Sequence, residues 1–588
     1  MRSMRSGEKD TSFPEEIVRN VEIHWDAGIA LHDGVRLSAT LYLPKPQMSP
    51  APCVFTMTPY IAQTFHETGM YFAAHGMPFL AVDVRGRGNS EGVFKPNINE
   101  GRDGADVASW IVKQSFSDGQ VAMIGGSYGG LAQWNTAKER PNGLATIIPV
   151  ASPLIGLDFP MRKNVFSPYI IQWLTLVAGR TSQDRLFWDN ERFWGERFRE
   201  WFESGAPFKN VDTMLGLPSS TFQEWIAHPH AGKYWDAHNP TEQQYESIGL
   251  PILTITGIYD GDQPGALAHY RNHLKSRSGT KTTDHYLVIG PWDHAGTRSP
   301  QLNFAGLKVG PASLLDLTDL QLQWMRWIMQ GGPRPPFLKN RVAYYVIGAD
   351  TWRYAASLEE TTSRSIRLHL DADTNPTDLY RSGQLSKDAP RELREDHYVY
   401  DPADVSAASI EAHVDPESRT DQRMVHLGTG KQLVYHSDAF EVDTEITGFF
   451  AFDAWISIDQ PDTDFKVSIY RVDIDGSSTL LTSDWLRARY AVRPQGALIT
   501  DSAPRLYRFQ DFPFAAWLCR RGARLRLVFG PINSIFSEKN YNTGGIVAEE
   551  SRQDSRPVRV KLLHGADYCS TLIVPLGRSR GDDEVVYP

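Results

Sequence analysis

Hydrophobic and polar positions form two kinds of pattern along the first part of the chain. Alternating segments at 28–31 and 35–43 flank a turn at 32–34, which predicts a β-hairpin. A stretch at 105–114 has helical spacing. Continuous apolar runs predict buried strands at 53–57, 78–82 and 121–124. Strands that alternate with helices favour a parallel sheet covered on both faces.

The stretch at 153–249 differs from its surroundings, because strand-like alternation is scarce while aromatic residues and helix formers are frequent. Trp173, Phe187 and Trp225 are examples of these aromatic residues. The pattern predicts a helical cap inserted over an apolar region. Ordinary packing between helices accounts equally well for any one of these side chains.

The α/β pattern returns with apolar runs at 251–257 and 285–290, followed by a helix near 312–330. Residues 331–336 are glycines, prolines and one arginine, which predicts a linker. Short alternating strands follow at 342–347, 366–370, 447–458, 466–472, 525–529 and 571–574. Such a series is typical of an all-β sandwich, so the fold class predicted is an α/β core followed by an all-β domain.

Size and composition agree with a multidomain globular protein. Domains of about 100–200 residues predict roughly three in a chain of 588 residues. Hydrophobic residues make up 41% and charged residues 22%, so disorder over most of the length is not expected. The formal net charge of −10 argues against a nucleic-acid partner, which would favour a basic face.

Cysteine usage and terminal sequence predict a cytoplasmic protein. Cys53, Cys519 and Cys569 are far apart and form no CxxC pair, so we expect unpaired thiols and a reducing compartment. The basic N-terminus has no apolar segment behind it, which argues against a secretory signal. No run of about 18 apolar residues occurs, so no membrane-spanning helix and no membrane partner are expected.

A glycine-rich segment at 125–130 carries the strongest chemical signal. It has the pattern G-x-S-x-G around Ser127 and lies between an apolar strand and an expected helix. In such a strand-to-helix turn the serine backbone is strained, and side chains at the glycine positions would collide with neighbouring elements. We therefore predict that Ser127 is a nucleophile whose oxygen lies beside the amino end of a helix.

A serine nucleophile needs a general base and an acid that orients it. His294 follows the strand at 285–290, and Asp260 follows the strand at 251–257, so both lie where open α/β sheets place their sites. Along the chain the serine comes first, then the acid and then the histidine, which is the order that accompanies a G-x-S-x-G nucleophile on an α/β sheet. Asp262 is a rival acid, whereas Asp293 adjoins His294 and its side chain should diverge from the imidazole.

A catalytic metal is the alternative that these residues leave open. His228 and His230, with the acids near residue 260, could in principle bind an ion. No HExxH or equivalent spacing occurs in the chain, so we expect no metal and no other cofactor.

The chain resembles the cocaine esterase-like branch of the X-Pro dipeptidyl-peptidase family over nearly its whole length. The matching motifs lie at 83–92 (D-x-R-G-x-G-x-S-x-G), 125–130, 259–261, 290–294, 462–465, 486–490 and 540–544. The resemblance implies an α/β-hydrolase core in two parts, a helical cap and a C-terminal jelly roll, at 20–152, 250–338, 153–249 and 339–588. We expect Arg85 and Arg87, in the first motif, to form structural salt bridges.

The resemblance also implies an unusual oxyanion hole. In the family, a tyrosine hydroxyl and the backbone N–H that follows the nucleophile share this task, and here they match Tyr60 and Tyr128. The expected reaction is cleavage of a small-molecule ester or amide through an acyl-enzyme on Ser127, with His294 as base and Asp260 as orienting acid.

The aromatic cap favours an apolar or aromatic acyl group. The family also includes β-lactam acylases, α-amino acid ester hydrolases and X-Pro dipeptidyl-peptidases. Peptidase action needs an anchor for a free amino terminus, and Glu191, Glu196 and Glu203 of the cap are candidates for it, unless they form a solvated helix face. An acyltransferase, and a carbohydrate-binding protein with an idle hydrolase core, also stay open, as does assembly into a homo-oligomer.

Overall fold

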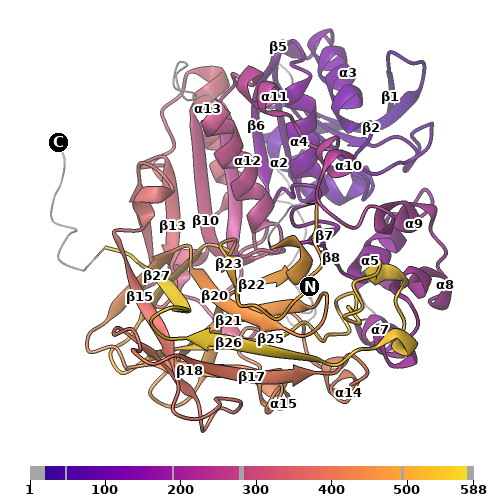
Figure 1. The fold of residues 1–588 in the computed structure, drawn as a ribbon. Coiled ribbons are helices and arrows are strands. Elements are labelled where there is room, and N and C mark those ends of the chain that lie inside the picture. The colour runs from indigo at the N-terminus through magenta and orange to yellow at the C-terminus, as the bar shows by residue number, and fades with distance from the viewer. Residues whose placement is uncertain (1–19, 47–48, 189–190, 277–283, 492–494, 579–588) are drawn as a thin grey trace.

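The computed structural model describes the chain except residues 1–19, 47–48, 189–190, 277–283, 492–494 and 579–588. Two large sheets form the molecule. Figure 1 shows the N-terminal sheet in the upper part, several helices of the cap at the right, and the C-terminal strands below both. In the described residues no helix is both long and apolar enough to cross a membrane.

The N-terminal sheet has ten strands in the order β1-β2-β4-β3-β5-β6-β9-β10-β13-β14. Their bounds are β1 Val21–Ala30, β2 Arg36–Pro44, β3 Ala51–Thr58, β4 Phe79–Asp83, β5 Ser117–Gly126, β6 Leu144–Val150, β9 Ile252–Tyr259, β10 His285–Asp293, β13 Val342–Val346 and β14 Thr351–Ala355. In this order, β4 to β13 pair in parallel with one another, whereas β1 and β2 at one end of the sheet and β14 at the other pair antiparallel with their neighbours. The predicted hairpin is the β1–β2 pair, and the predicted parallel sheet is confirmed.

Helices cover both faces of this sheet. Successive residues of a strand point to opposite faces, so neighbouring apolar residues pack against different helices. Met123 packs into a cluster with helices α3 and α4, whereas Ile124 packs into a cluster with helices α2 and α13. The helices around the sheet are α2 His66–Ala74, α3 Glu100–Val112, α4 Tyr128–Lys138, α12 Gln263–Ser276 and α13 Leu317–Gln330.

The cap between β6 and β9 is helical, as predicted, apart from one short hairpin. Its elements are β7 Met161–Arg162, β8 Val165–Phe166, α5 Tyr169–Leu176, α6 Asp184–Trp188, α7 Glu191–Ser204, α8 Val211–Met214, α9 Ser220–Ile226, α10 Lys233–Asp236 and α11 Glu242–Ser247. Most of its aromatic side chains pack against one another and are buried, including Trp194, Trp201 and Phe222. For these three residues the interpretation as ordinary helix packing holds.

The strand at 342–346 does not belong to the C-terminal sheet, with which the sequence pattern grouped it. It is β13, which pairs in parallel with β10 and antiparallel with β14. Its five residues are all buried, because helices or the C-terminal strands cover both faces. The apolar pattern of a fully buried strand does not reveal which sheet it joins.

Within the described residues the C-terminal sheet has thirteen strands, and its apolar core continues into buried side chains of β9, β10 and β13 of the N-terminal sheet. The strands are β15 Arg364–Asp371, β16 Gly383–Ser386, β17 Arg394–Tyr400, β18 Leu433–Ser437, β19 Thr444–Gly448, β20 Ala451–Ile458, β21 Asp464–Val472, β22 Ser478–Arg487, β23 Arg505–Phe509, β24 Ala515–Cys519, β25 Arg524–Pro531, β26 Val558–His564 and β27 Thr571–Leu576. Short elements outside the two sheets are β11 Asn303–Phe304, β12 Leu307–Lys308, α14 Ala408–Glu411 and α15 Arg423–Leu427. This part is the predicted all-β sandwich.

Candidate active site

Ser127 lies in a strained turn between β5 and α4. Its backbone has φ 58° and ψ −120°, a left-handed value that a side chain makes costly. The turn is held because the Ser127 amide donates to the Val150 carbonyl over 2.9 Å and the Ser127 carbonyl accepts from the Gly130 amide over 2.8 Å. The neighbouring strand β6 thus fixes the serine at the amino end of α4.

Two glycines around Ser127 are required by space and backbone conformation. Gly125 has φ 148°, where L-residues are rare. A Cβ on Gly130 would lie 2.9 Å from the Val150 carbonyl oxygen, closer than carbon and oxygen can pack. The expected steric origin of the glycine pattern therefore holds at Gly125 and Gly130, whereas a Cβ on Gly129 would meet only an ordinary contact, 3.6 Å from the Met57 carbonyl oxygen.

His294 and Asp260 are brought together by strand register. In the parallel pair β9–β10, Tyr259 lies opposite Asp293, so the next residue of each strand lies beside the other. His294 Nδ1 is 2.7 Å from Asp260 Oδ1. The Asp260 carboxylate also accepts from the Thr256 hydroxyl over 2.8 Å and from the Asp262 amide over 3.0 Å.

Electrostatics favour an ionised Asp260 and a basic His294. Burial opposes the charged form of Asp260, but the His294 charge and the hydrogen bonds outweigh it and hold the pKa of Asp260 below its usual range. Burial likewise disfavours the imidazolium of His294, yet Asp260 more than compensates and raises the pKa of His294. This pair has the arrangement that a base and its orienting acid require.

The two other candidate acids occupy different positions. Asp262 Oδ2 is 3.7 Å from His294 Nδ1, beyond a hydrogen bond. Burial and the neighbouring Asp260 raise the pKa of Asp262 to about 7. Asp293 accepts from the Gly296 amide over 2.7 Å and so closes its own turn, which agrees with the expected divergence from His294.

Tyr60 follows β3, and its side chain interacts with that of Ser127, which counters part of the effect of burial on the Tyr60 pKa. The Tyr60 hydroxyl accepts a hydrogen bond from Trp173 Nε1 over 3.0 Å. Burial raises the pKa of Tyr60, so the phenol keeps its proton at neutral pH. Tyr128 is the first residue of α4, and its own hydroxyl donates to Glu100.

Comparison with known proteins decides the family. A model described as X-Pro dipeptidyl-peptidase (S15 family) matches residues 33–296, and a model of the X-Pro dipeptidyl-peptidase C-terminal non-catalytic domain matches residues 338–496. The chain belongs to this family of serine hydrolases. As a family member it is an enzyme of the esterase type, with the α/β-hydrolase fold and a C-terminal β-sandwich.

Individual proteins similar to this chain are distant from it in sequence. Cocaine esterase of Rhodococcus sp. (strain MB1 Bresler) is 23% identical, covering 95% of this chain and 99% of the relative. A solved α-amino acid ester hydrolase and an aminopeptidase from a marine sediment archaeon of the Thaumarchaeota each give a TM-score of 0.81 at 19% identity, covering 98% of this chain and all of theirs. At such identity the two structures establish the fold alone.

Two residues near the site of this serine hydrolase escaped sequence reasoning. A Cβ on Gly126 would lie 2.6 Å from the Arg298 guanidinium, so this cation lies against the residue before the nucleophile. Trp173 was one of many aromatic residues in the cap, and no pattern marked its contact with Tyr60. Arg298 follows His294 by four residues, and that short separation was the available signal.

The motif arginines of the family differ from each other. Arg85 forms the expected salt bridges, at 2.7 Å to both Asp103 and Asp33. Arg87 instead is buried and donates to backbone carbonyls, including those of Pro59 and Val177 over 2.8 Å each. A buried guanidinium with its five donors suits carbonyls as well as carboxylates.

Two of the three cap acids lie beside an arginine of their own helix. The Glu196 carboxylate is 2.6 Å and that of Glu203 3.5 Å from the Arg199 guanidinium, as expected for a solvated helix face. The side chain of Glu191 lies outside the described residues.

The histidines weighed as metal ligands do not converge with the site. His228 stacks on Tyr234 at 3.6 Å, and His230 lies against Tyr490. In the described part of the chain, the group with ligand atoms close enough for an ion is Asp260, Asp262 and His294. Asp260 and His294 already bond each other, which fits an acid–base pair better than a metal centre.

Proposed function

We propose that this enzyme hydrolyses carboxylic esters through an acyl-enzyme on Ser127. The observation that carries the proposal is the hydrogen-bonded His294–Asp260 pair, which extends from the same sheet edge as the strained turn of Ser127. A serine hydroxyl attacks a carbonyl carbon only when a base takes its proton. His294 is the base, and Asp260 holds its tautomer and stabilises the imidazolium.

The oxyanion is held by two donors in this mechanism. When Ser127 Oγ attacks, the carbonyl oxygen becomes negative and needs fixed donors within about 2.7–3.1 Å. The Tyr60 hydroxyl and the Tyr128 backbone N–H supply them, and the amino end of α4 adds its positive dipole. His294 then protonates the leaving alcohol, and a water molecule attacks the acyl-enzyme by the reverse proton transfers.

The surroundings of Tyr60 support an apolar or aromatic acyl group. Trp173 packs edge to face with Phe159 at 5.3 Å and stacks with Trp225 at 6.3 Å. Tyr169, on the same helix α5, is 42% exposed and interacts electrostatically with Tyr60 and Arg298. Aromatic walls of this kind bind apolar groups by area and shape.

An ester of an α-amino acid is a second candidate substrate, because Asp262 offers a carboxylate beside the catalytic pair. The Asp262 side chain lies 3.7 Å from the imidazole and interacts electrostatically with Asp158, whose pKa is raised well above its usual value by burial and by Asp262. A protonated amine bound there would favour the ionised form of both carboxyl groups. The names of the solved relatives, α-amino acid ester hydrolase and aminopeptidase, agree with this candidate.

A matched pair of substrates separates the two candidates. The methyl esters of phenylacetic acid and phenylglycine differ by one amino group, so the ratio of their kcat/KM values measures amine recognition. Comparable values support the first proposal, and a preference of more than about tenfold for phenylglycine, lost in Asp262→Asn, supports the second. The same assays are extended to a β-lactam amide, an X-Pro anilide and an alcohol acceptor, which test the acylase, peptidase and acyltransferase alternatives.

Covalent labelling tests the nucleophile itself. Failure of a fluorophosphonate to label Ser127 would contradict every covalent mechanism.

The pH dependence of kcat/KM should respond in opposite directions to two substitutions. Deprotonation of His294 sets the acid limb of the profile. The negative charge of Asp262 raises the pKa of His294, and the positive charge of Arg298 lowers it. Asp262→Asn should therefore move the acid limb to lower pH, and Arg298→Gln should move it to higher pH, with phenylacetate ester as substrate.

The control for this experiment is Arg505→Gln, which removes a charge from β23 in the C-terminal sandwich. Its acid limb should coincide with that of the parent enzyme. Movement of both site variants in the same direction would show that His294 does not control the limb.

A further inference from the structure

The hydroxyl of Tyr60 has two neighbours, and the direction of one of the two interactions is fixed. An indole N–H is a donor and never an acceptor, so Trp173 Nε1 must donate to the phenol oxygen over 3.0 Å. The phenol has a single proton of its own, which cannot point at the indole N–H. That proton is therefore left to the side of Ser127, whose side chain interacts with Tyr60.

We infer that Trp173 is a positioning residue of the oxyanion hole, which turns the Tyr60 hydroxyl proton toward Ser127 and is itself held by the C-terminal β-domain. The inference rests on the proposed oxyanion role of Tyr60. It assigns a function in the hydrolytic site to a cap residue and, through it, to strands more than three hundred positions further along the chain.

The ring of Trp173 is fixed in orientation. It is 5% exposed, lies on α5 and stacks with Tyr128 at 6.0 Å and with Trp225 at 6.3 Å. Phe159 packs edge to face against it at 5.3 Å. A buried ring in three such contacts cannot rotate without breaking them, so its N–H keeps one direction.

Arg87 ties the tyrosine and the tryptophan to one another. Its Nε donates to the carbonyl of Pro59, next to Tyr60, and its Nη1 donates to the carbonyl of Val177, next to the end of α5. Both distances are 2.8 Å. One rigid guanidinium therefore sets the spacing between the loop of Tyr60 and the helix of Trp173.

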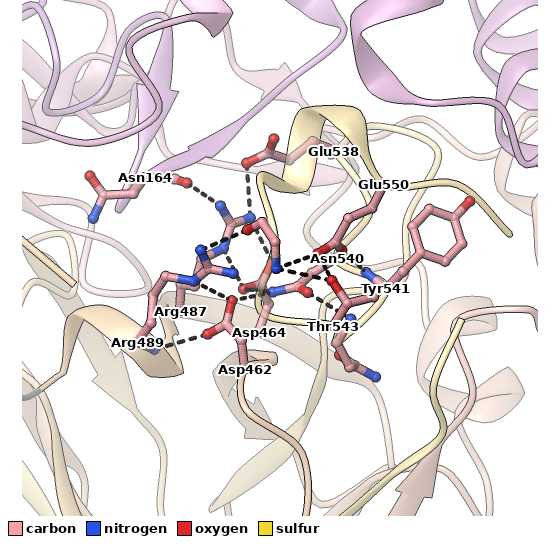
Figure 2. Close-up of polar contacts among 12 residues, drawn as sticks. Asn164, Asp462, Asp464, Arg487, Arg489, Glu538, Asn540, Tyr541, Thr543 and Glu550 are labelled. Atoms are coloured by element: carbon pink, nitrogen blue, oxygen red, sulfur yellow. Dashed lines mark hydrogen bonds and ion pairs between the residues drawn. The ribbon is translucent and has the colours of Figure 1, made fainter. Parts of the chain in front are cut away.

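The C-terminal β-domain holds the hairpin from which α5 starts. Arg487 Nη1 donates to the Asn164 carbonyl over 2.8 Å, and Figure 2 shows this guanidinium directed between Asn164 and Glu538. Glu538 pairs with Phe166 through both its amide and its carboxylate, at 2.8 and 3.1 Å. Phe166 ends β8 three residues before α5, so the hydrogen bonds to Asn164 and Phe166 determine where the helix begins.

Arg487, Glu538 and Asp464 form a buried polar cluster that supports these hydrogen bonds. The side chains of Arg487 and Glu538 are 1% exposed, and that of Asp464 is 2% exposed. Arg487 binds Asp464 through two nitrogens, at 2.7 and 2.9 Å, and binds Glu538 at 2.8 Å. Bidentate and charge-assisted bonds fix geometry more firmly than single neutral ones. The hairpin thus rests on a rigid support.

A double-mutant cycle tests the inference. Tyr60→Phe should lower kcat for the phenylacetate ester about 10²–10³-fold, the loss typical of one oxyanion donor. Trp173→Phe keeps an aromatic ring without the N–H, and should lower kcat about tenfold with KM nearly unchanged. In the Tyr60→Phe background, Trp173→Phe should change kcat by less than about twofold, because no hydroxyl is left to orient.

Trp225→Phe is the matched control, since it makes the same change on the ring that stacks with Trp173. Its effect on kcat should be the same in both Tyr60 backgrounds. Equal losses from Trp173→Phe in both backgrounds would overturn the inference, because Trp173 would then act by packing alone. A Tyr60→Phe enzyme with unchanged kcat would instead contradict the oxyanion assignment of the proposed function.

A second variant covers the case in which Trp173→Phe does not fold. Benzothienylalanine, placed at position 173 by nonsense suppression, keeps the bicyclic shape and replaces the indole N–H by sulfur. It should reproduce the same tenfold loss and the same dependence on Tyr60. A variant with parent kcat would show that the N–H does not orient the hydroxyl.

Discussion

Replacing Ser127 by alanine is expected to lower kcat for ester hydrolysis by about 10⁵–10⁶-fold, while the protein stays folded. The loss is large because the covalent route disappears and no other hydroxyl takes its place in the strained turn. His294→Ala should lose about as much, and the double variant no more, since the two groups act as one unit. Single-turnover kinetics and fluorophosphonate labelling measure the effect.

Ser299→Ala provides the control, because this exposed serine follows the His294 loop. It should retain the parent kcat and the parent labelling. If Ser127→Ala retained more than about a hundredth of the activity, another nucleophile would have to be sought.

Replacing Arg487 by methionine is expected to reduce the free energy of unfolding by about 3–5 kcal/mol. The substitution leaves Asp464 and Glu538 buried without their cation. Burial already raises the pKa of Glu538, and loss of the guanidinium would raise it further. A carboxyl with a raised pKa binds a proton more readily when folded, so the deficit should shrink as the pH falls. Urea unfolding at several pH values checks both statements.

An exposed ion pair, that of Arg505 with Asp501, is the control for the buried cluster of Arg487. Arg505 lies 2.8 Å from Asp501, whose side chain is 57% exposed. Arg505→Met should therefore change the free energy of unfolding by less than about 1 kcal/mol at any pH. Similar losses from both arginines would mean that the buried cluster contributes no more than a surface pair.

Local signals predicted the parts of the site that lie at strand ends. The glycines around Ser127 predict its tight turn, and the approach of Asp260 to His294 follows from two parallel neighbouring strands. Asp260 was preferred to Asp262 from the sequence because it directly follows the strand. The hydrogen bond from His294 to Asp260 at 2.7 Å, against a separation of 3.7 Å for Asp262, agrees with that preference.

Contacts between distant segments could not be predicted from the sequence. Trp173 and Tyr60 are 113 positions apart, and an aromatic residue that orients a hydroxyl looks like any other in a helical cap. The role of Arg87 as a donor to carbonyls was missed for a similar reason, since a motif of charged residues does not name its partners. Such roles depend on tertiary packing, which hydrophobic periodicity does not record.

The pairing of β13 with β10 makes the two halves of the enzyme mutually dependent. A shortened chain that stopped at the glycine- and proline-rich stretch near residue 335 would leave β10 as an open edge, with unpaired amides along an apolar strand. Residue Ile347, just past β13, also exchanges backbone hydrogen bonds with Ala516 and Leu518. The catalytic half is therefore not a module that can be separated at the glycine- and proline-rich stretch. Attempts to isolate it there would favour self-association through the open strand edge.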